Sequence, residues 1–245
     1  MKNLLVLFLS LSFSFSFSQI TSRIIEVKDG QMDEFIKMTG KKTKKYNNQE
    51  GSARFVTYEI LSGPSAGNIW RLRLASAEQM DAYSLDSAES KYWQKNVVPH
   101  IKDDQVGGLF MWNYLGNYSD NVNSEDQNHV MALFYNYDDS GEEDFWRFRE
   151  RIAKARKAME EKPKGSMFSL GCSSGCSGNQ TVIMFEYESF EGQQKYNSEQ
   201  LPKLVEKYNE LFGGDAYEQD VNNMSKTLNS RRTIHLRRIP EASSD

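Results

Sequence analysis

Two arginines in a strand-like segment are the residues best suited to bind a ligand. Arg71 and Arg73 alternate in the sequence with Trp70, Leu72 and Leu74. Successive side chains of a strand point to opposite faces of a sheet, so the two arginines share one face. We expect helices to cover the apolar face. The arginines would then point to the other side.

The last apolar segment of the chain repeats this pattern. His235 and Arg237 alternate with Ile234 and Leu236, so the same rule places the histidine and the arginine on the face away from the helices. Three groups from other strand-like segments could join them. These are Glu26, Tyr58 and Glu59.

Such a cluster would suit a carboxylate or another small anion, because guanidinium groups bind carboxylates through two parallel hydrogen bonds. The alternative is structural, since buried charges are usually paired with one another. The acidic residues available for such pairs are Glu26, Glu59, Glu186 and Glu188. The sequence leaves both interpretations open.

The two cysteines, Cys172 and Cys176, lie in a glycine- and serine-rich segment. In an oxidising compartment their simplest state is a local disulfide, which stabilises modestly because the loop it closes is short. A redox or metal-binding pair is the alternative, but the spacing differs from that of redox motifs and no histidine is near. We therefore predict a disulfide.

Histidine is too scarce to indicate a metal site. His100, His129 and His235 are far apart in the sequence, and none has a partner at ligand spacing. We predict no metal and no cofactor, although haem bound through His100 or His235 stays open because histidine is a common axial ligand. The sequence also contains no nucleophile motif, glycine-rich phosphate loop or acidic metal cluster.

The order of apolar patterns predicts the scaffold that positions these residues. Up to residue 115 the pattern indicates a strand, a helix, two strands, a helix and a strand, which is the order of a ferredoxin-like unit. Ser76 and Gln79 have the spacing of a capping box at the start of the second helix. The predicted elements cover 23–27, 31–46, 54–61, 68–75, 76–99 and 109–115.

The same order recurs after a polar segment. Ser140 and Glu143 give a second capping-box pattern at the start of a helix. The predicted elements of this second copy cover 129–137, 140–162, 167–170, 181–188, 193–212 and 231–239.

Local matches support a duplication, because Gly67-Asn68 and Gly178-Asn179 stand at equivalent places in the two copies. We therefore predict two α+β modules in tandem. They cover 19–115 and 129–240, with a linker at 116–128 and a tail at 241–245.

The N-terminal residues predict export. Lys2 precedes an apolar run that is too short to span a membrane, and Ser16 and Ser18 stand where signal peptidase requires small residues. We expect residues 1–18 to be removed and the mature protein to be periplasmic or secreted. No later segment is apolar for long enough to predict a membrane span. The formal net charge of −4, with basic residues scattered among acidic ones, argues against nucleic-acid binding.

Segment 27–35, a strand followed by a glycine turn and an amphipathic helix, resembles the opening of dimeric α/β-barrel proteins. This superfamily includes antibiotic-biosynthesis monooxygenase-like and stress-responsive barrel domains. Segment 83–99, with Tyr83, Tyr92-Trp93 and Val97-Val98-Pro99, is similar to its second-helix pattern. Several catalytic members carry a helical histidine where this chain has segment 87–90. That difference argues against cyclase and haem-degrading chemistry.

The resemblance implies two four-stranded sheets that form a barrel with helices outside. A tandem chain would close this barrel alone as a pseudo-dimeric monomer, with further self-association open. We therefore expect an exported barrel whose lumen, lined by Arg71, Arg73, His235 and Arg237, binds a small organic and possibly anionic ligand. The first alternative is a cofactor-independent monooxygenase-like enzyme that uses the same cavity. The second is a structural or interaction protein with a filled core.

Overall fold

Eight antiparallel strands form one continuous sheet that closes on itself. The computed structural model describes residues 19–102, 109–119, 127–159, 165–170 and 178–244. The strand order is β1-β3-β2-β8-β5-β7-β6-β4, and β4 pairs with β1 to complete the ring. The strands are β1 (Gln19–Ile25), β2 (Arg54–Ile60), β3 (Ile69–Ala75), β4 (Phe110–Tyr114), β5 (His129–Tyr137), β6 (Gly165–Leu170), β7 (Asn179–Tyr187) and β8 (Leu228–Arg238).

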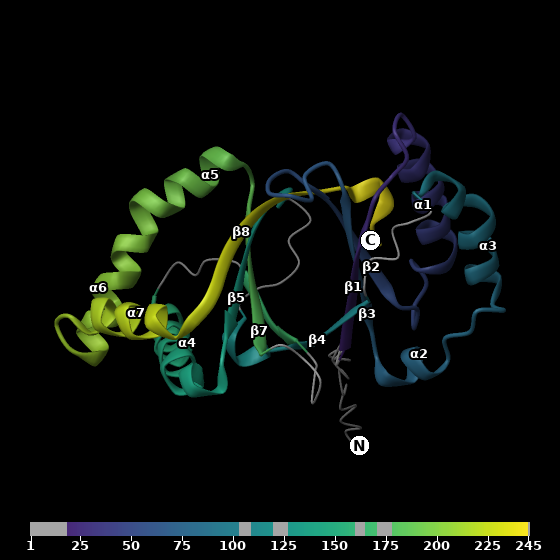
Figure 1. Cartoon of the computed structure of the whole chain (residues 1–245). Helices are drawn as coiled ribbons and strands as arrows, with labels where there is room; N and C mark the ends of the chain where they lie inside the picture. The colour runs from purple at the N-terminus through teal and green to yellow at the C-terminus, as the bar shows by residue number, and fades with distance from the viewer. Residues whose placement is uncertain (1–18, 103–108, 120–126, 160–164, 171–177, 245) are drawn as a thin grey trace, which may run out of the picture.

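Helices cover the outside of this closed sheet on two opposite sides (Figure 1). The first helical layer, beside β1 to β3, consists of α1 (Met32–Tyr46), α2 (Ala77–Asp81) and α3 (Ala88–Asn96). The second helical layer, beside β5 and β7, consists of α4 (Glu142–Lys157), α5 (Phe190–Lys195), α6 (Leu201–Phe212) and α7 (Ala216–Thr227). A π-helical segment, Tyr196–Gln200, connects α5 to α6.

The predicted order of elements agrees with the structure, except that one predicted helix is divided, one predicted capping box is absent and one helix was not predicted. The second predicted helix is divided into α2 and α3, because Ser87 caps a new helix by accepting a hydrogen bond from the Ser90 amide. The capping box of Ser76 is present, whereas the one predicted at Ser140 was wrong, since α4 begins after Gly141 with no side-chain cap. Helix α7 was not predicted.

The interior of the closed sheet is an apolar core. One cluster of buried side chains draws members from all eight strands and contains no helical residue. It includes Trp70, Leu72, Trp112, Phe134 and Leu236. An eight-stranded barrel has an interior that side chains can just fill, and these large residues fill it. Two further apolar clusters lie outside the sheet, one beneath each helical layer.

The C-terminal residues pack onto the first half of the molecule. The Ser244 amide donates to the Phe55 carbonyl at 2.7 Å, and the Thr57 amide donates to Ser243 Oγ at 3.0 Å. Gly40 of α1 permits this approach, since a Cβ atom there would overlap the carbonyl oxygen of Glu241. Residues 241–244 of the segment predicted as a tail therefore pack onto the first half, and Glu241 lies against α1.

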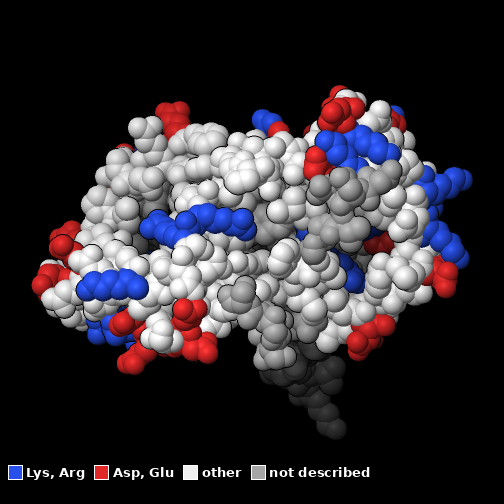
Figure 2. All heavy atoms as spheres, in the orientation of Figure 1, with Lys and Arg blue, Asp and Glu red and all other residues white. Residues whose placement is uncertain are grey.

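Several predictions fall outside the described residues. They are the signal peptide at 1–18, the disulfide between Cys172 and Cys176, and most of the linker. Within the described residues, no helix is long and apolar enough to cross a membrane. Acidic and basic side chains are interspersed around the edges of both halves on the face shown in Figure 2.

Candidate functional site

The arginines predicted to line the barrel interior point outward instead. Trp70 and Leu72 belong to the interior core, while Arg71 and Arg73 lie on the opposite face of β3, beneath the first helical layer. The prediction was wrong because it assumed that helices cover the apolar face of a sheet. In a closed sheet the interior is the face most removed from water, so it takes the apolar side chains.

The other residues predicted to line the barrel interior lie in different parts of the molecule. Tyr58 faces the interior core, and burial raises the pKa of its hydroxyl group. Glu59 lies on the outer surface, where its carboxylate accepts a hydrogen bond from Arg237 Nε at 3.1 Å. Glu26 is paired with Lys102 at 2.6 Å, outside the barrel. These residues therefore do not form the predicted lumenal cluster.

The barrel interior holds small cavities in the part of the chain that the structure describes. One, of about 80 Å³, is lined in part by Trp70, Trp112 and Phe134. Another, of about 50 Å³, lies beside Tyr58 and Met184. Pockets for small molecules usually measure roughly 300–1,000 Å³. The lumen is thus too full to be the binding cavity that the sequence suggested.

A larger cavity, of about 370 Å³, lies between the first helical layer and strands β1 to β3. We call it the basic pocket. Its basic residues come from three elements, β1, α1 and β3, and are Arg23, Lys42, Arg71 and Arg73. Glu89 of α3 is the acidic residue in its described lining, and Phe55, Tyr83 and Trp93 supply aromatic rings.

Arg71 lies deep in the basic pocket and is 2% exposed. Its guanidinium donates to Thr57 Oγ1 at 2.6 Å, to the Ala242 carbonyl at 2.9 Å and to Thr43 Oγ1 at 2.8 Å. Its Nε atom is buried without a hydrogen-bond partner among the described residues. Burial, together with the positive charge of Arg23, lowers the pKa of Arg71 to about 9. Its partners are neutral, so none of them balances its charge.

Lys42 reaches the same pocket from α1 and is 3% exposed. Its ammonium group donates to Asn47 Oδ1 at 2.7 Å, forms an ion pair with Glu89 and lies 3.8 Å from the centre of the Phe55 ring. Burial and the nearby charge of Arg71 lower the pKa of Lys42 to about 7, although Glu89 opposes that shift. Lys42 can therefore gain or lose a proton near neutral pH.

The remaining two cations lie closer to the surface of the pocket. The Arg23 guanidinium lies 4.7 Å from the centre of the Trp93 ring, which is a cation–π distance. Arg73 donates to the carbonyl of Gln79 at 3.0 Å, and partial burial lowers the pKa of its side chain. Among the described residues of the lining, four basic side chains thus accompany one carboxylate, and such an excess of positive charge attracts anions.

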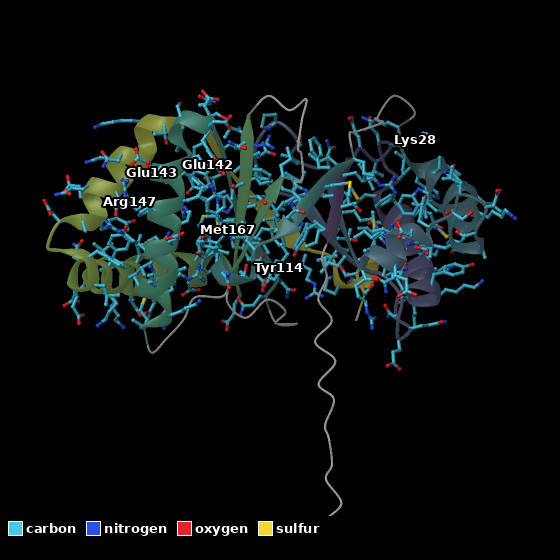
Figure 3. All side chains as sticks on the ribbon, turned by 90° about the horizontal axis from the view of Figure 1, so that it is seen from below. Lys28, Tyr114, Glu142, Glu143, Arg147 and Met167 are labelled. Atoms are coloured by element: carbon cyan, nitrogen blue, oxygen red, sulfur yellow. The ribbon has the colours of Figure 1, made fainter. Side chains whose placement is uncertain are left out.

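The corresponding space beneath the second helical layer is filled. Phe145 and Tyr208 are fully buried there, within an aromatic core. Arg149 is also buried, and its guanidinium lies over the rings of Phe145 and Phe148 at 5.5 and 4.6 Å. Arg147 projects from α4 in this layer (Figure 3) and is paired with Asp220 at 3.0 Å. Ion pairs in this half connect α4 to α7.

The histidines do not line the basic pocket. His100 Nδ1 lies 3.0 Å from Gln31 Oε1. His235 Nδ1 lies 3.3 Å from His129 Nε2, and the rings of His129 and Phe190 lie beside His235. Among the described residues, no group of three or more His, Cys, Asp or Glu could hold a metal ion.

Sequence reasoning found Arg71 and Arg73 but missed Lys42, Arg23 and Glu89. A signal for Lys42 was present, since it lies seven residues after Phe35 and three after Thr39, at the helical spacing of the buried face of α1. A lysine on the buried face of an amphipathic helix needs a partner or a ligand. Nothing in the sequence related Lys42 to Arg71, because only packing brings α1 onto β3.

Solved structures share this fold at low sequence identity. A candidate monooxygenase from Lactobacillus acidophilus NCFM matches with a TM-score of 0.62 and 10% identity, over 93% of this chain and 96% of that one. A candidate monooxygenase from Fusobacterium nucleatum subsp. nucleatum ATCC 25586 gives 0.63 and 9%, over 90% and 91%. A variant chlorite dismutase from Candidatus Nitrospira defluvii gives 0.55 and 10%, over 93% of each chain.

No protein-family model and no curated protein sequence matches the chain. At about 10% identity the likeness to the solved structures shows the fold alone. The predicted α+β, ferredoxin-like fold is confirmed at that level.

Proposed function

We propose that this protein binds a small organic anion, such as a carboxylate, in the basic pocket. The observation that carries the proposal is that Arg71 and Lys42, both almost fully buried, line one cavity in which Glu89 supplies the single carboxylate among the described lining residues. Removing a charge from water is costly unless an opposite charge compensates it. A bound carboxylate would supply that compensation and accept hydrogen bonds from these groups.

The aromatic walls favour a ligand with an apolar body. Phe55 and Trp93 form part of the lining on opposite sides, from β2 and α3. Ligand pockets typically combine such apolar walls with a few polar groups that set the orientation of the ligand. The cavity volume of about 370 Å³ also falls within the usual range for small molecules.

The proposal includes export and duplication. Cleavage after residue 18 would release the protein to the periplasm or beyond, where it would meet its ligand. The four strands of the first half follow the order β4-β1-β3-β2, and those of the second half follow the equivalent order β8-β5-β7-β6. This correspondence supports a duplicated, pseudo-dimeric α/β barrel in which the space between helices and sheet is open in the first copy and filled in the second.

A second candidate function is a cofactor-independent, monooxygenase-like reaction in the same pocket. It is favoured by the structural likeness to candidate monooxygenases. Lys42, with a pKa of about 7, could accept a substrate proton. Oxygen consumption in the presence of a bound ligand would separate this function from simple binding. The filled interior fits a purely structural protein, but the basic pocket does not.

The test is a calorimetric titration of the mature protein with benzoate, compared between two arginine variants. Arg71→Met removes a buried cation from the pocket, whereas Arg149→Met removes one from the filled second half. We expect Arg71→Met to weaken binding by about tenfold to a hundredfold, as for hydrogen bonds to charged groups, and Arg149→Met to leave it unchanged.

Arg71→Met also removes the hydrogen bonds to Thr57 and Ala242, so Arg23→Met, which changes an exposed residue, serves as a second variant. We expect a smaller loss of affinity there. Equal affinities in all four proteins, or no benzoate binding in any of them, would refute the proposal.

A further inference from the structure

Three large apolar side chains are exposed at the mouth of the basic pocket. Tyr83 is 54% exposed, Leu85 73% and Leu109 66%, and all three line the same cavity as Arg71 and Lys42. Exposed apolar side chains that gather in one place commonly mark a contact surface, whereas single ones need no explanation. Their position around a pocket makes a ligand the simplest contact.

The polarity of the pocket is inverted relative to an ordinary protein surface. Charged residues usually lie outside and apolar residues inside. Here Arg71 and Lys42 are buried at the floor, whereas Leu85 and Leu109 extend into water at the rim. Trp93 is almost fully buried and also lines the pocket. A ligand that matches this gradient has its charge at the inner end and its apolar part at the outer end.

We propose that the ligand is an amphiphilic anion, whose carboxylate head binds at Arg71 and Lys42 and whose apolar chain leaves the pocket between Tyr83, Leu85 and Leu109. This inference rests on the proposed function and specifies the class of its ligand. A chain in this position would cover the exposed side chains of the rim. Each methylene group removed from water would add to the affinity.

The test is a calorimetric titration with acetate, hexanoate and decanoate below the concentrations at which micelles form. We expect affinity to rise about twofold to fourfold for each methylene group that contacts the protein. Decyltrimethylammonium, which has the same chain with the opposite charge, should bind far more weakly. Equal affinities for acetate and decanoate, or equal affinity for the cationic amphiphile, would overturn the inference.

Two surface variants test the place of the chain. Leu85→Ser and Leu109→Ser should each lower the affinity for decanoate toward that for acetate. Leu211→Ser on α6 is the matched control, because Leu211 is 46% exposed in the other half of the molecule. It should leave the dependence on chain length intact. A dependence that survives both rim substitutions would contradict the proposed path of the chain.

Failure of this inference is distinguishable from failure of the proposed function. If benzoate and acetate bind and chain length has no effect on affinity, the proposed anion site is supported and the inference of an amphiphilic ligand is wrong. If no carboxylate binds, the proposed function itself is wrong. These outcomes come from the same titrations of the whole mature chain.

Discussion

The two halves of the molecule have the same strand order and a helical layer in the same place, but they use the space beneath that layer differently. In the first half it is a pocket of about 370 Å³ with four cations. In the second half it is a closed aromatic core that includes Phe145 and Tyr208. The same backbone plan therefore supports either a site or a core, and the side chains decide which.

Buried arginines show this difference most directly. Arg71 donates its hydrogen bonds to neutral oxygens and keeps one buried nitrogen unpaired beside a cavity. Arg149 Nε is likewise buried without a hydrogen-bond partner among the described residues, but this guanidinium lies within the aromatic core of the second half, over the Phe148 ring and 3.4 Å from Met224 Sδ. Arg149 is thus part of the packing. Arg71 borders the basic pocket, where the proposed anion would bind.

The largest expected effect is a loss of unfolding free energy, and it tests how tightly side chains pack beneath the second helical layer. Phe145→Ala removes a fully buried ring, so we expect the free energy of unfolding to fall by about 3–5 kcal/mol. Phe55→Ala removes a half-buried ring that borders the pocket, and its cost should be less than half as large. Urea denaturation measures both values. Equal losses would mean that the two halves are packed alike.

The next largest effect is the change in unfolding free energy when an acidic residue is neutralised, and we compare Asp220 of the second half with Glu89 of the first. Asp220 is paired with Arg147, Arg151 and Tyr208. Burial alone would raise the pKa of Asp220, but these hydrogen bonds outweigh burial and the pKa lies below its ordinary value. Asp220→Asn should therefore cost about 2–3 kcal/mol of unfolding free energy, less than for a fully buried pair. Urea denaturation again provides the measurement.

Glu89→Gln is the matched change in the first half. It removes the carboxylate that is paired with Lys42. We expect it to change stability little, because Lys42 can release its proton near neutral pH, and to strengthen benzoate binding because no internal anion competes. A stability loss as large as that of Asp220→Asn would show that Glu89 also has a mainly structural role.

The smallest expected effect is the pH dependence of benzoate affinity, which we expect to depend on Lys42 of the first half. Lys42 loses its charge as pH rises through its pKa of about 7, whereas benzoate stays ionised from pH 6 upward. The affinity should therefore fall by about fivefold, or roughly 1 kcal/mol, between pH 6 and pH 8, a window that lies below the pKa of about 9 of Arg71. Calorimetry measures the change. It should vanish in Lys42→Met and persist in Lys154→Met, which changes an exposed lysine of α4.

The proton of Lys42 also makes stability depend on pH. Stability should rise with pH, whereas benzoate affinity should fall. A lysine in the unfolded chain has a pKa of about 10.4, so between pH 7 and that value the unfolded state binds more protons than the folded state. The contribution of Lys42 therefore makes the folded protein more stable as pH rises through this window. Urea denaturation of Lys42→Met should show a smaller rise than the unchanged protein. An unchanged slope would contradict the lowered pKa.

Much of the fold could be predicted from local patterns. The segment 129–137 is β5 in the structure, and the limits of α1 and β2 differ from the prediction by one residue. Helix α7 was missed, although Tyr217, Val221 and Met224 have helical spacing. The site was only half predicted, since Arg71 was chosen correctly as a buried charge but assigned to the wrong face of its strand.

The amino-acid sequence by itself determined the order of the elements and the two-faced character of β3, because alternation and helical spacing depend only on near neighbours. Only the tertiary structure decided which face of β3 is interior, since that depends on the closure of β4 onto β1. It also decided that Lys42, Arg71 and Glu89 share one cavity. These residues lie on different elements, and the packing of α1 and α3 on the sheet brings them together.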